Sequence, residues 1–235
     1  MDILTAGGNL ASFATRDDTS DGALIMGIIG ESEYPFARMQ NLTGWALDAG
    51  AHIGIVSVAL GLDNPDLKIL AVEPVAENAA ILRQNIARNG LNERVFVIEA
   101  ALGEDGETEL VCAYTKAGAE PEGYVHDNRF IGNLYTSGDM DIKADRRTVE
   151  SISISTLVLR YAIDRIAFMK SDTEGSEWVY LKDKAMNRVM WLIGEAHAGP
   201  GLPGLRKMLP KHKVEQIDDL LVNFIFEAKL KGAAA

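Results

Sequence analysis

Short apolar runs alternate along the chain with longer stretches whose apolar residues recur at helical spacing. The runs at 45–49, 68–72, 95–99, 165–170 and 191–195 each end at a polar residue or a turn, so they predict strands. Further strands are predicted over 107–114, 213–217 and 221–228, and helices over 53–60, 76–89, 176–184 and 202–209. This alternation predicts an α/β fold, a mostly parallel sheet with helices on both faces.

Two parts of the chain depart from this pattern. Residues 1–44 are mixed, with one apolar run at 24–29 that suits a strand, and we interpret them as an N-terminal arm on a domain spanning 45–235. Residues 115–150 combine glycines, charges and scattered aromatic side chains. A connection this long favours a lid over a plain surface excursion. Its candidate substrate contacts are Tyr124, His126 and Tyr135.

The turn after the first strand of the alternating block carries the first candidate site. In open α/β sheets, ligands bind beyond the carboxyl ends of the strands. Gly50 allows a tight turn and Gly54 a close helix, while the free N–H groups at the helix start suit a carboxylate or ribose oxygens. The residues of this turn expected to bind a cofactor are Asp48, Gly50, Ala51, His52, Ile53 and Gly54.

The spacing of the glycines distinguishes two cofactors. A dinucleotide site requires Gly-x-Gly-x-x-Gly, whereas this turn has Asp-x-Gly-x-x-x-Gly, and Asp48 would repel a pyrophosphate. Asp48 suits a ligand with an ammonium group, or waters around a sulfonium. Glu73, followed by Pro74, ends the next strand, where a carboxylate accepts both ribose hydroxyls. The pattern favours S-adenosylmethionine (SAM) over NAD.

Charge and cysteine content narrow the partners and the compartment. The net charge of −11, without any basic run, argues against nucleic acid, whose binding requires Lys and Arg. Cys112 is the single cysteine, so an intrachain disulfide and a cysteine zinc site are excluded. A reducing cytoplasm fits this content. With no apolar run of membrane-spanning length and no signal-like start, we expect a cytoplasmic protein without a membrane partner.

Four segments together resemble one known family. They are Leu47–Gly54, Val72-Glu73-Pro74, Ala101-Leu102-Gly103 and, most specifically, the Lys-x-Asp-x-Glu-Gly-x-Glu motif within Phe168–Glu177. The combination resembles the FkbM-type methyltransferases over roughly residues 45–197. The resemblance implies a Rossmann-like class I methyltransferase fold, with a mostly parallel seven-stranded sheet and an antiparallel C-terminal strand.

The resemblance also implies an activity and a placement of SAM. These enzymes are often O-methyltransferases of natural-product or glycan pathways, so the expected acceptor is a hydroxyl on a sugar or secondary metabolite. Glu73 would hold the ribose and the Asp48–Gly54 turn the amino-acid part. Glu99 and Ala100 would lie beside the adenine. Residues 1–40 match nothing in the family, and neither do residues 115–150.

Candidate catalytic residues follow two strands of the predicted sheet. Methyl transfer needs an aligned acceptor, and an alcohol benefits from a general base. His197 is our first candidate because histidine titrates near neutral pH, and Asp172 is the second, as base or as partner of the methionine ammonium. Glu195 belongs to the same group. Glu174 is a candidate substrate contact, although it and Glu177 also suit the start of the next helix.

Three alternatives remain open from the sequence. Asp172, Glu195 and His197 could instead hold a divalent metal such as Mg²⁺ or Mn²⁺, although we expect none. The chain could be an NAD-dependent oxidoreductase, which would bind NAD and not S-adenosylhomocysteine. It could also be a non-catalytic SAM- or nucleoside-binding module, with a cofactor but no acceptor pocket. Homodimer formation is left open.

Overall fold

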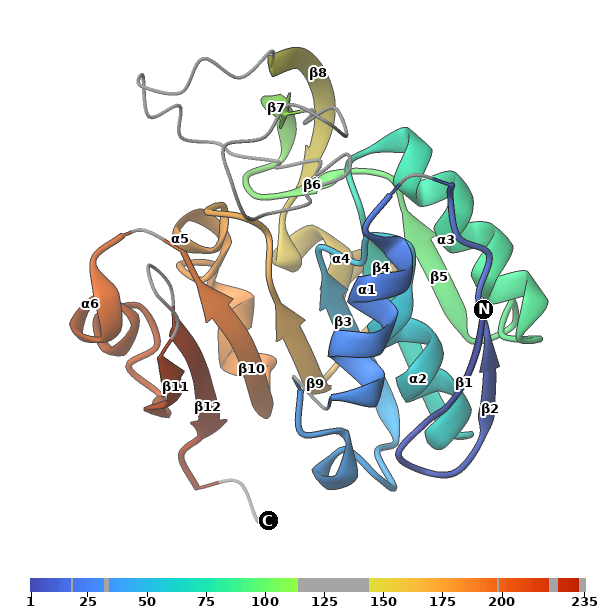
Figure 1. Ribbon diagram of the computed structural model, residues 1–235. Helices are drawn as coiled ribbons and strands as arrows, with labels where there is room; N and C mark the ends of the chain where they lie inside the picture. The colour runs from blue at the N-terminus through green and yellow to red at the C-terminus, as the bar shows by residue number, and fades with distance from the viewer. Residues whose placement is uncertain (18, 32–33, 114–143, 198, 220–223, 233–235) are drawn as a thin grey trace.

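The computed structural model describes residues 1–17, 19–31, 34–113, 144–197, 199–219 and 224–232, and a seven-stranded sheet forms its centre (Figure 1). In spatial order its strands are β11 (His212–Asp219), β12 (Phe224–Leu230), β10 (Trp191–Ala196), β9 (Ile166–Ser171), β3 (Gly44–Ala49), β4 (Leu67–Val72) and β5 (Val95–Ile98). β12 runs antiparallel to both neighbours, and the other neighbouring pairs are parallel. The predicted class I sheet, with its antiparallel C-terminal strand, is confirmed.

Consecutive apolar residues of each central strand serve two different cores. Ala46, Ile69 and Phe168 face one core, while their neighbours Leu47, Leu70 and Met169 face the other. This follows from the two-residue repeat of a strand, and burial on both faces explains why these strands are continuously apolar.

Helices cover both faces of the sheet. The first core takes its helical side chains from α1 (Asp21–Ile25), α2 (Ile55–Asp63) and α3 (Ala76–Arg88). The second takes them from α4 (Ile154–Arg160), α5 (Glu177–Tyr180) and α6 (Gly201–Met208). Within the described part of the chain, no helix has the length and apolar character that a membrane crossing requires.

A second sheet of three strands accounts for part of the segment that we assigned to a lid. It contains β6 (Ala101–Leu102), β8 (Ala144–Ile152) and β7 (Gly106–Ala113), and it stands at the top of Figure 1, above the end of the main sheet where α5 lies. Residues 144–150 therefore belong to a strand paired with β7 along its length. The rest of the predicted lid, with Tyr124, His126 and Tyr135, lies outside the described residues.

The strand predicted at 24–29 is wrong. Strands β1 (Asp2–Leu4) and β2 (Leu10–Ser12) form a hairpin earlier in the arm, and 24–29 falls in α1 and the π-helical turn Met26–Gly30 that continues it. Ile25 and Ile29 are buried, whereas Met26 is largely exposed. Burial four residues apart is helical spacing, which the short apolar run concealed. A 3₁₀ turn, Phe36–Arg38, completes the arm.

The helix predicted over 176–184 is shorter than expected. α5 covers Glu177–Tyr180, and a separate 3₁₀ turn follows over Lys184–Arg188. Between them, the Asp183 carboxylate accepts the Ala185 N–H and so caps the start of that turn. An aspartate in this position favours a new start over a continued helix.

The strand order places a topological switch point at the centre of the sheet. From β3 the chain moves outward to β4 and β5, and it later returns to β9 on the other side of β3. The connections after β3 and β9 therefore diverge at neighbouring carboxyl ends. Such a switch point is where open α/β sheets bind ligands.

Candidate active site

The turn after β3 fits directly against the turn after β9. Gly50 has a φ of 75°, and an added Cβ would overlap the carbonyl oxygen of Asp172. The Asp172 N–H in turn donates to the Ala49 carbonyl at 3.2 Å. Gly54, with a φ of 91°, leaves no room for a Cβ beside Leu82 of α3. Only glycine satisfies both the left-handed backbone and the close approach.

Glu73 is buried at the end of β4, with its carboxylate held by the backbone of the turn. One oxygen accepts the His52 N–H at 2.8 Å, and the other accepts the Val75 N–H at 3.0 Å and the Asn78 side-chain amide at 3.3 Å. Burial raises the pKa of Glu73, against the effect of these hydrogen bonds. A carboxylate has about four acceptor positions, and three are occupied here, so about one remains, on Oε2, for a ribose hydroxyl.

Lys170, on β9, connects the turn after β3 with the turn after β9 through its buried ammonium group. Its ammonium is buried, donates to the Gly50 carbonyl at 2.8 Å and lies 3.4 Å from Asp172 Oδ2 and 3.9 Å from Asp48 Oδ1. Asp48 is 1% exposed, and its other oxygen accepts the Ser57 hydroxyl at 2.6 Å. Asp48 thus faces the interior side of the turn, where burial raises its pKa.

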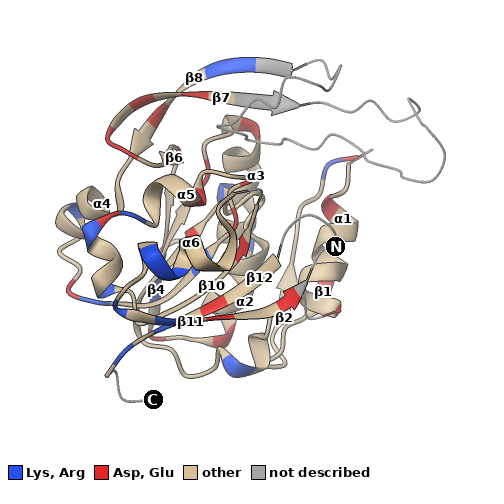
Figure 2. Ribbon diagram, turned by 90° about the vertical axis from the view of Figure 1, so that its left-hand side faces the viewer, with Lys and Arg blue, Asp and Glu red and all other residues tan. Residues whose placement is uncertain are grey.

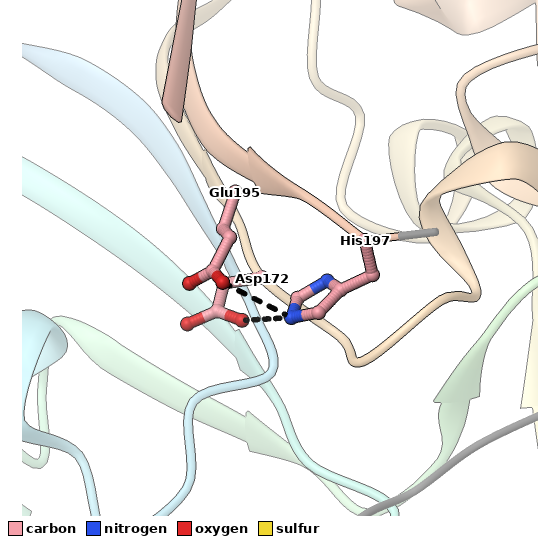
Figure 3. A group of neighbouring side chains, drawn as sticks. All are labelled: Asp172, Glu195 and His197. Carbon is pink, nitrogen blue, oxygen red and sulfur yellow. Dashed lines mark ion pairs between the residues drawn. The ribbon is translucent and has the colours of Figure 1, made fainter. Parts of the chain in front are cut away.

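Four side chains converge at the carboxyl ends of β9 and β10. His197 Nε2 lies 3.2 Å from Glu174 Oε2, 3.5 Å from Glu195 Oε1 and 3.9 Å from Asp172 Oδ1. Figure 3 shows the Asp172 and Glu195 carboxylates directed at the same edge of the imidazole ring. The sequence candidates for catalysis are therefore neighbours in space, as their positions after adjacent strands predict.

Glu177 holds His197 in place from the opposite side. Its carboxylate is fully buried, and one oxygen accepts the His197 backbone N–H at 2.7 Å and lies 3.0 Å from Nδ1. The other oxygen accepts the Gly175 N–H at 2.9 Å and the Thr173 hydroxyl at 3.0 Å. Glu177 does begin α5, as expected, but its side chain mainly orders the histidine and the connection that follows β9.

Two residues of this cluster, His197 and Glu174, have raised pKa values. Burial alone would lower the pKa of His197, but the Glu177 hydrogen bond and the Glu174 charge outweigh it and raise this pKa to about 9. Burial and repulsion by Asp172 raise the pKa of Glu174 to about 7. Glu174 also has a φ of 56°, a left-handed conformation that is uncommon outside glycine and recurs at functional sites.

The N-terminal arm reaches the cofactor turn through Arg16. Its guanidinium makes a two-pronged ion pair with the buried Asp21, at 3.0 and 2.8 Å. It also donates to the Asn78 side chain at 2.7 Å and lies 3.3 Å from His52 Nε2. Burial lowers the pKa of His52 to about 4, so this ring is neutral at pH 7. The arm is thereby joined to the residues around Glu73.

A second arm residue, Tyr34, reaches the candidate catalytic cluster of Asp172, Glu174, Glu195 and His197. Its ring is buried, and its hydroxyl donates to Asp172 Oδ2 at 3.2 Å. Burial alone would raise the pKa of Asp172, but Lys170 and His197, with the Tyr34 hydrogen bond, lower it. Sequence reasoning missed Arg16, Tyr34 and Asn78 because no motif surrounds them. For Glu177 the signal was present in the Lys-x-Asp-x-Glu-Gly-x-Glu motif.

The remaining candidate residues lie along the same edge of the sheet. Ala51 and Ile53 are buried within the turn, Pro74 follows Glu73, and Ala100 is buried beyond β5. Glu99 is exposed and pairs with Arg83 of α3 at 2.8 Å. Cys112 lies in β7, as predicted, although its side chain is outside the described residues.

Solved structures with the same fold differ widely from this chain in sequence. A conserved hypothetical protein of Streptococcus pyogenes matches with a TM-score of 0.50 and 11% identity, covering 91% of this chain and 97% of that one. A provisionally assigned rRNA methylase of Clostridium thermocellum gives 0.50 and 11%, over 86% and 94%. A precorrin-6y C5,15-methyltransferase of Geobacter metallireducens gives 0.49 and 13%, over 93% and 94%. At 11% identity, the two matches with a TM-score of 0.50 concern the fold alone.

The family comparison is more specific. No curated protein matches the chain significantly. The sequence model of one family, the methyltransferase FkbM domain, however, matches residues 48–226. This range includes Gly50, Glu73 and the candidate catalytic residues from Asp172 to His197. The sequence-based expectation of SAM as the cofactor is confirmed. The chain belongs to the FkbM methyltransferase domain family.

Proposed function

We propose that this protein transfers a methyl group from SAM to a hydroxyl of a small molecule, such as a sugar or a secondary metabolite. In this proposal Glu73 holds the ribose and the Asp48–Gly54 turn holds the methionine part. Glu99 and Ala100 border the adenine. Asp48 supports this turn without touching the cofactor, because its carboxylate faces the protein interior, where it contacts Lys170 and Ser57.

One observation carries the proposal. The candidate catalytic residues Asp172, Glu195 and His197 lie next to the Asp48–Gly54 turn. The Asp172 N–H is bonded to Ala49, and Lys170 connects Asp172 with Gly50. A methyl group on a cofactor bound at this turn would thus be presented to Asp172, Glu195 and His197. Direct in-line transfer requires alignment above all.

The proton of the acceptor hydroxyl needs a destination within the cluster. His197 is a poor base at neutral pH because its pKa of about 9 keeps the ring protonated. Glu174 is better suited. Its carboxyl is the most exposed of the four residues, and its pKa of about 7 matches a general base near neutral pH. Without a bound cation, His197 Nε2 lies 3.2 Å from Glu174 and holds it in place.

The charge of the site favours an uncharged or cationic acceptor. Asp172, Glu174, Glu177 and Glu195 surround one imidazole, so a phosphate or carboxylate group would be repelled. In Figure 2, Lys and Arg lie scattered over β8, α6 and β11, without one continuous basic stripe on the face in view. Both features support a small-molecule acceptor over nucleic acid. A role in natural-product biosynthesis is proposed from the family resemblance, and a cytoplasmic location from the single cysteine.

The chemical type of the product tests this proposal. The protein is incubated with SAM carrying a labelled methyl group and a panel of polyhydroxylated sugars and phenols. A matched panel presents amines in place of the hydroxyls. We expect label in an ether of at least one hydroxyl compound, and its loss in the Glu174→Gln variant. Label only in amines would contradict O-methylation. Label in neither panel, with SAM bound, would support a non-catalytic module.

A further inference from the structure

Three donor atoms at the carboxyl ends of β9 and β10 have the spacing of metal ligands. Carboxylate oxygens of Asp172 and Glu195 and a ring nitrogen of His197 all lie within 4.8 Å of one another. Nε2 is 3.5 Å from Glu195 Oε1 and 3.9 Å from Asp172 Oδ1. Two ligands of one divalent ion are separated by roughly 3 to 3.5 Å, given bonds of about 2.1 Å. The two carboxylates and the imidazole ring are directed toward one another (Figure 3), and side-chain rotation has to shorten the longer of these separations when an ion binds.

The surroundings of His197 orient the ring as a metal ligand requires. Its Nδ1 lies 3.0 Å from the fully buried Glu177 carboxylate, which also accepts the backbone N–H of the same histidine. A carboxylate on one ring nitrogen fixes the tautomer and leaves the other nitrogen to the metal. Nearly all ligating histidines have such a partner, which is a carboxylate, a backbone carbonyl or a water. The nitrogen directed at Asp172 and Glu195 is Nε2.

Asp172 is oriented in the same way through its second oxygen. Oδ2 accepts the Tyr34 hydroxyl at 3.2 Å and lies 3.4 Å from Lys170. Oδ1 is the oxygen nearest to His197 Nε2. Two of the three donors are therefore held by buried partners through one atom, while the other atom faces a common point. Buried partners that orient ligands are a property of metal sites beyond mere proximity of acids.

We infer that Asp172, Glu195 and His197 bind one divalent cation of the Mg²⁺ or Mn²⁺ class, beside the methyl donor. Two carboxylates with one imidazole suit these ions. Their charge would offset a cluster with four carboxyl groups, counting Glu174 and Glu177, around one imidazole. The inference rests on the proposed methyl transfer and adds to it a group that binds the acceptor hydroxyl.

The cation would activate the acceptor hydroxyl directly. A metal-bound hydroxyl is more acidic. The hydroxyl proton passes to Glu174, and the oxygen forms a bond to the methyl carbon. The bond from that carbon to sulfur breaks, and its electron pair stays on sulfur to give S-adenosylhomocysteine. His197 coordinates the cation as the neutral ring. The cation then occupies the position of the Nε2 proton, which in the metal-free structure is directed at Glu174.

Manganese binding tests the inference without any acceptor. The full chain is freed of metal, saturated with S-adenosylhomocysteine and titrated with Mn²⁺, while the electron paramagnetic resonance signal of free Mn²⁺ is recorded. We expect about one bound Mn²⁺ per chain. Asp172→Asn and Glu195→Gln should each weaken binding at least tenfold. Glu177→Gln, which alters the partner of His197 without removing any of the three donors, should weaken it by about 10- to 100-fold.

Controls separate this inference from the proposed function. Glu215→Gln, at an exposed position on β11, should bind Mn²⁺ like the unmodified protein. S-adenosylhomocysteine affinity, measured by calorimetry on each variant, reports whether the fold and the cofactor site persist. Full S-adenosylhomocysteine binding without Mn²⁺ binding would overturn the metal site and leave methyl transfer standing. Equal Mn²⁺ binding in Asp172→Asn, Glu195→Gln and the unmodified protein would overturn it as well.

Discussion

At the scale of single residues, the contact between Gly50 and Asp172 joins the turn that we propose binds the cofactor to a residue that we propose takes part in catalysis. The left-handed φ of Gly50 and the absent Cβ let the turn after β3 touch the backbone that carries Asp172. The sequence predicted a tight turn here because glycine is spaced from Asp48 and Gly54 in a recognisable way. It did not predict which segment Gly50 touches, because Asp172 lies more than 120 residues further along the chain. The hydrogen bond from Lys170 to Gly50 likewise joins residues 120 positions apart.

A Gly50→Ala substitution tests this contact. The methyl group would overlap the Asp172 carbonyl and strain the left-handed backbone, so we expect the free energy of unfolding to fall by about 3 kcal/mol or more. S-adenosylhomocysteine binding should be lost. Chemical unfolding and calorimetry measure the two effects.

Gly90→Ala is the matched control. Gly90 has a φ of 68°, and a Cβ there would meet no atom within 4 Å, so only the backbone cost of about 1 kcal/mol applies. Equal losses in the two variants would show that conformation alone, and not the Asp172 contact, requires glycine at position 50.

At the scale of elements, the arm is the part that sequence reasoning described least well. Its helix was predicted as a strand because a short apolar run lacks a decisive period. The shortness of α5 and the pairing of β8 with β7 escaped prediction for a related reason, since each depends on contacts with distant segments. The central strands were predicted well because burial on both faces makes them apolar throughout.

The link between the arm and the cofactor turn yields a stability prediction. Arg16→Met removes the partner of Asp21, whose side chain is 1% exposed. A buried carboxylate without its guanidinium is costly, so we expect a loss of about 3 kcal/mol in urea unfolding. Adding Asp21→Asn should restore part of that loss.

The control for this prediction lies on the exposed side of α3. Arg88→Met should change the free energy of unfolding by less than about 0.5 kcal/mol, because Arg88 is exposed. If Arg16→Met proved as stable as Arg88→Met, the Arg16 contacts with Asp21 and Asn78 would not stabilise the arm, and the prediction would be wrong.

At the scale of the whole molecule, the topology gathers residues from distant parts of the sequence at one edge. β3, β4, β9 and β10 are neighbours, and their carboxyl ends bring together Gly50, Glu73, Asp172 and His197. Positions after parallel strands predict this much from sequence. The raised pKa of His197 and the contacts of Glu177 with it were not predictable, because they depend on distances of a few ångströms between side chains.

The central claim is that this edge of the sheet binds SAM, with Glu73 on the ribose. Calorimetry with S-adenosylhomocysteine tests it most directly, with NAD as the rival ligand and Glu93→Gln, at an exposed position, as the control. We predict one bound S-adenosylhomocysteine per chain, unchanged in Glu93→Gln. Glu73→Gln should bind about 10- to 100-fold more weakly, for lack of charge-assisted hydrogen bonds. Binding of NAD without S-adenosylhomocysteine, or equal affinity in Glu73→Gln, would contradict the account.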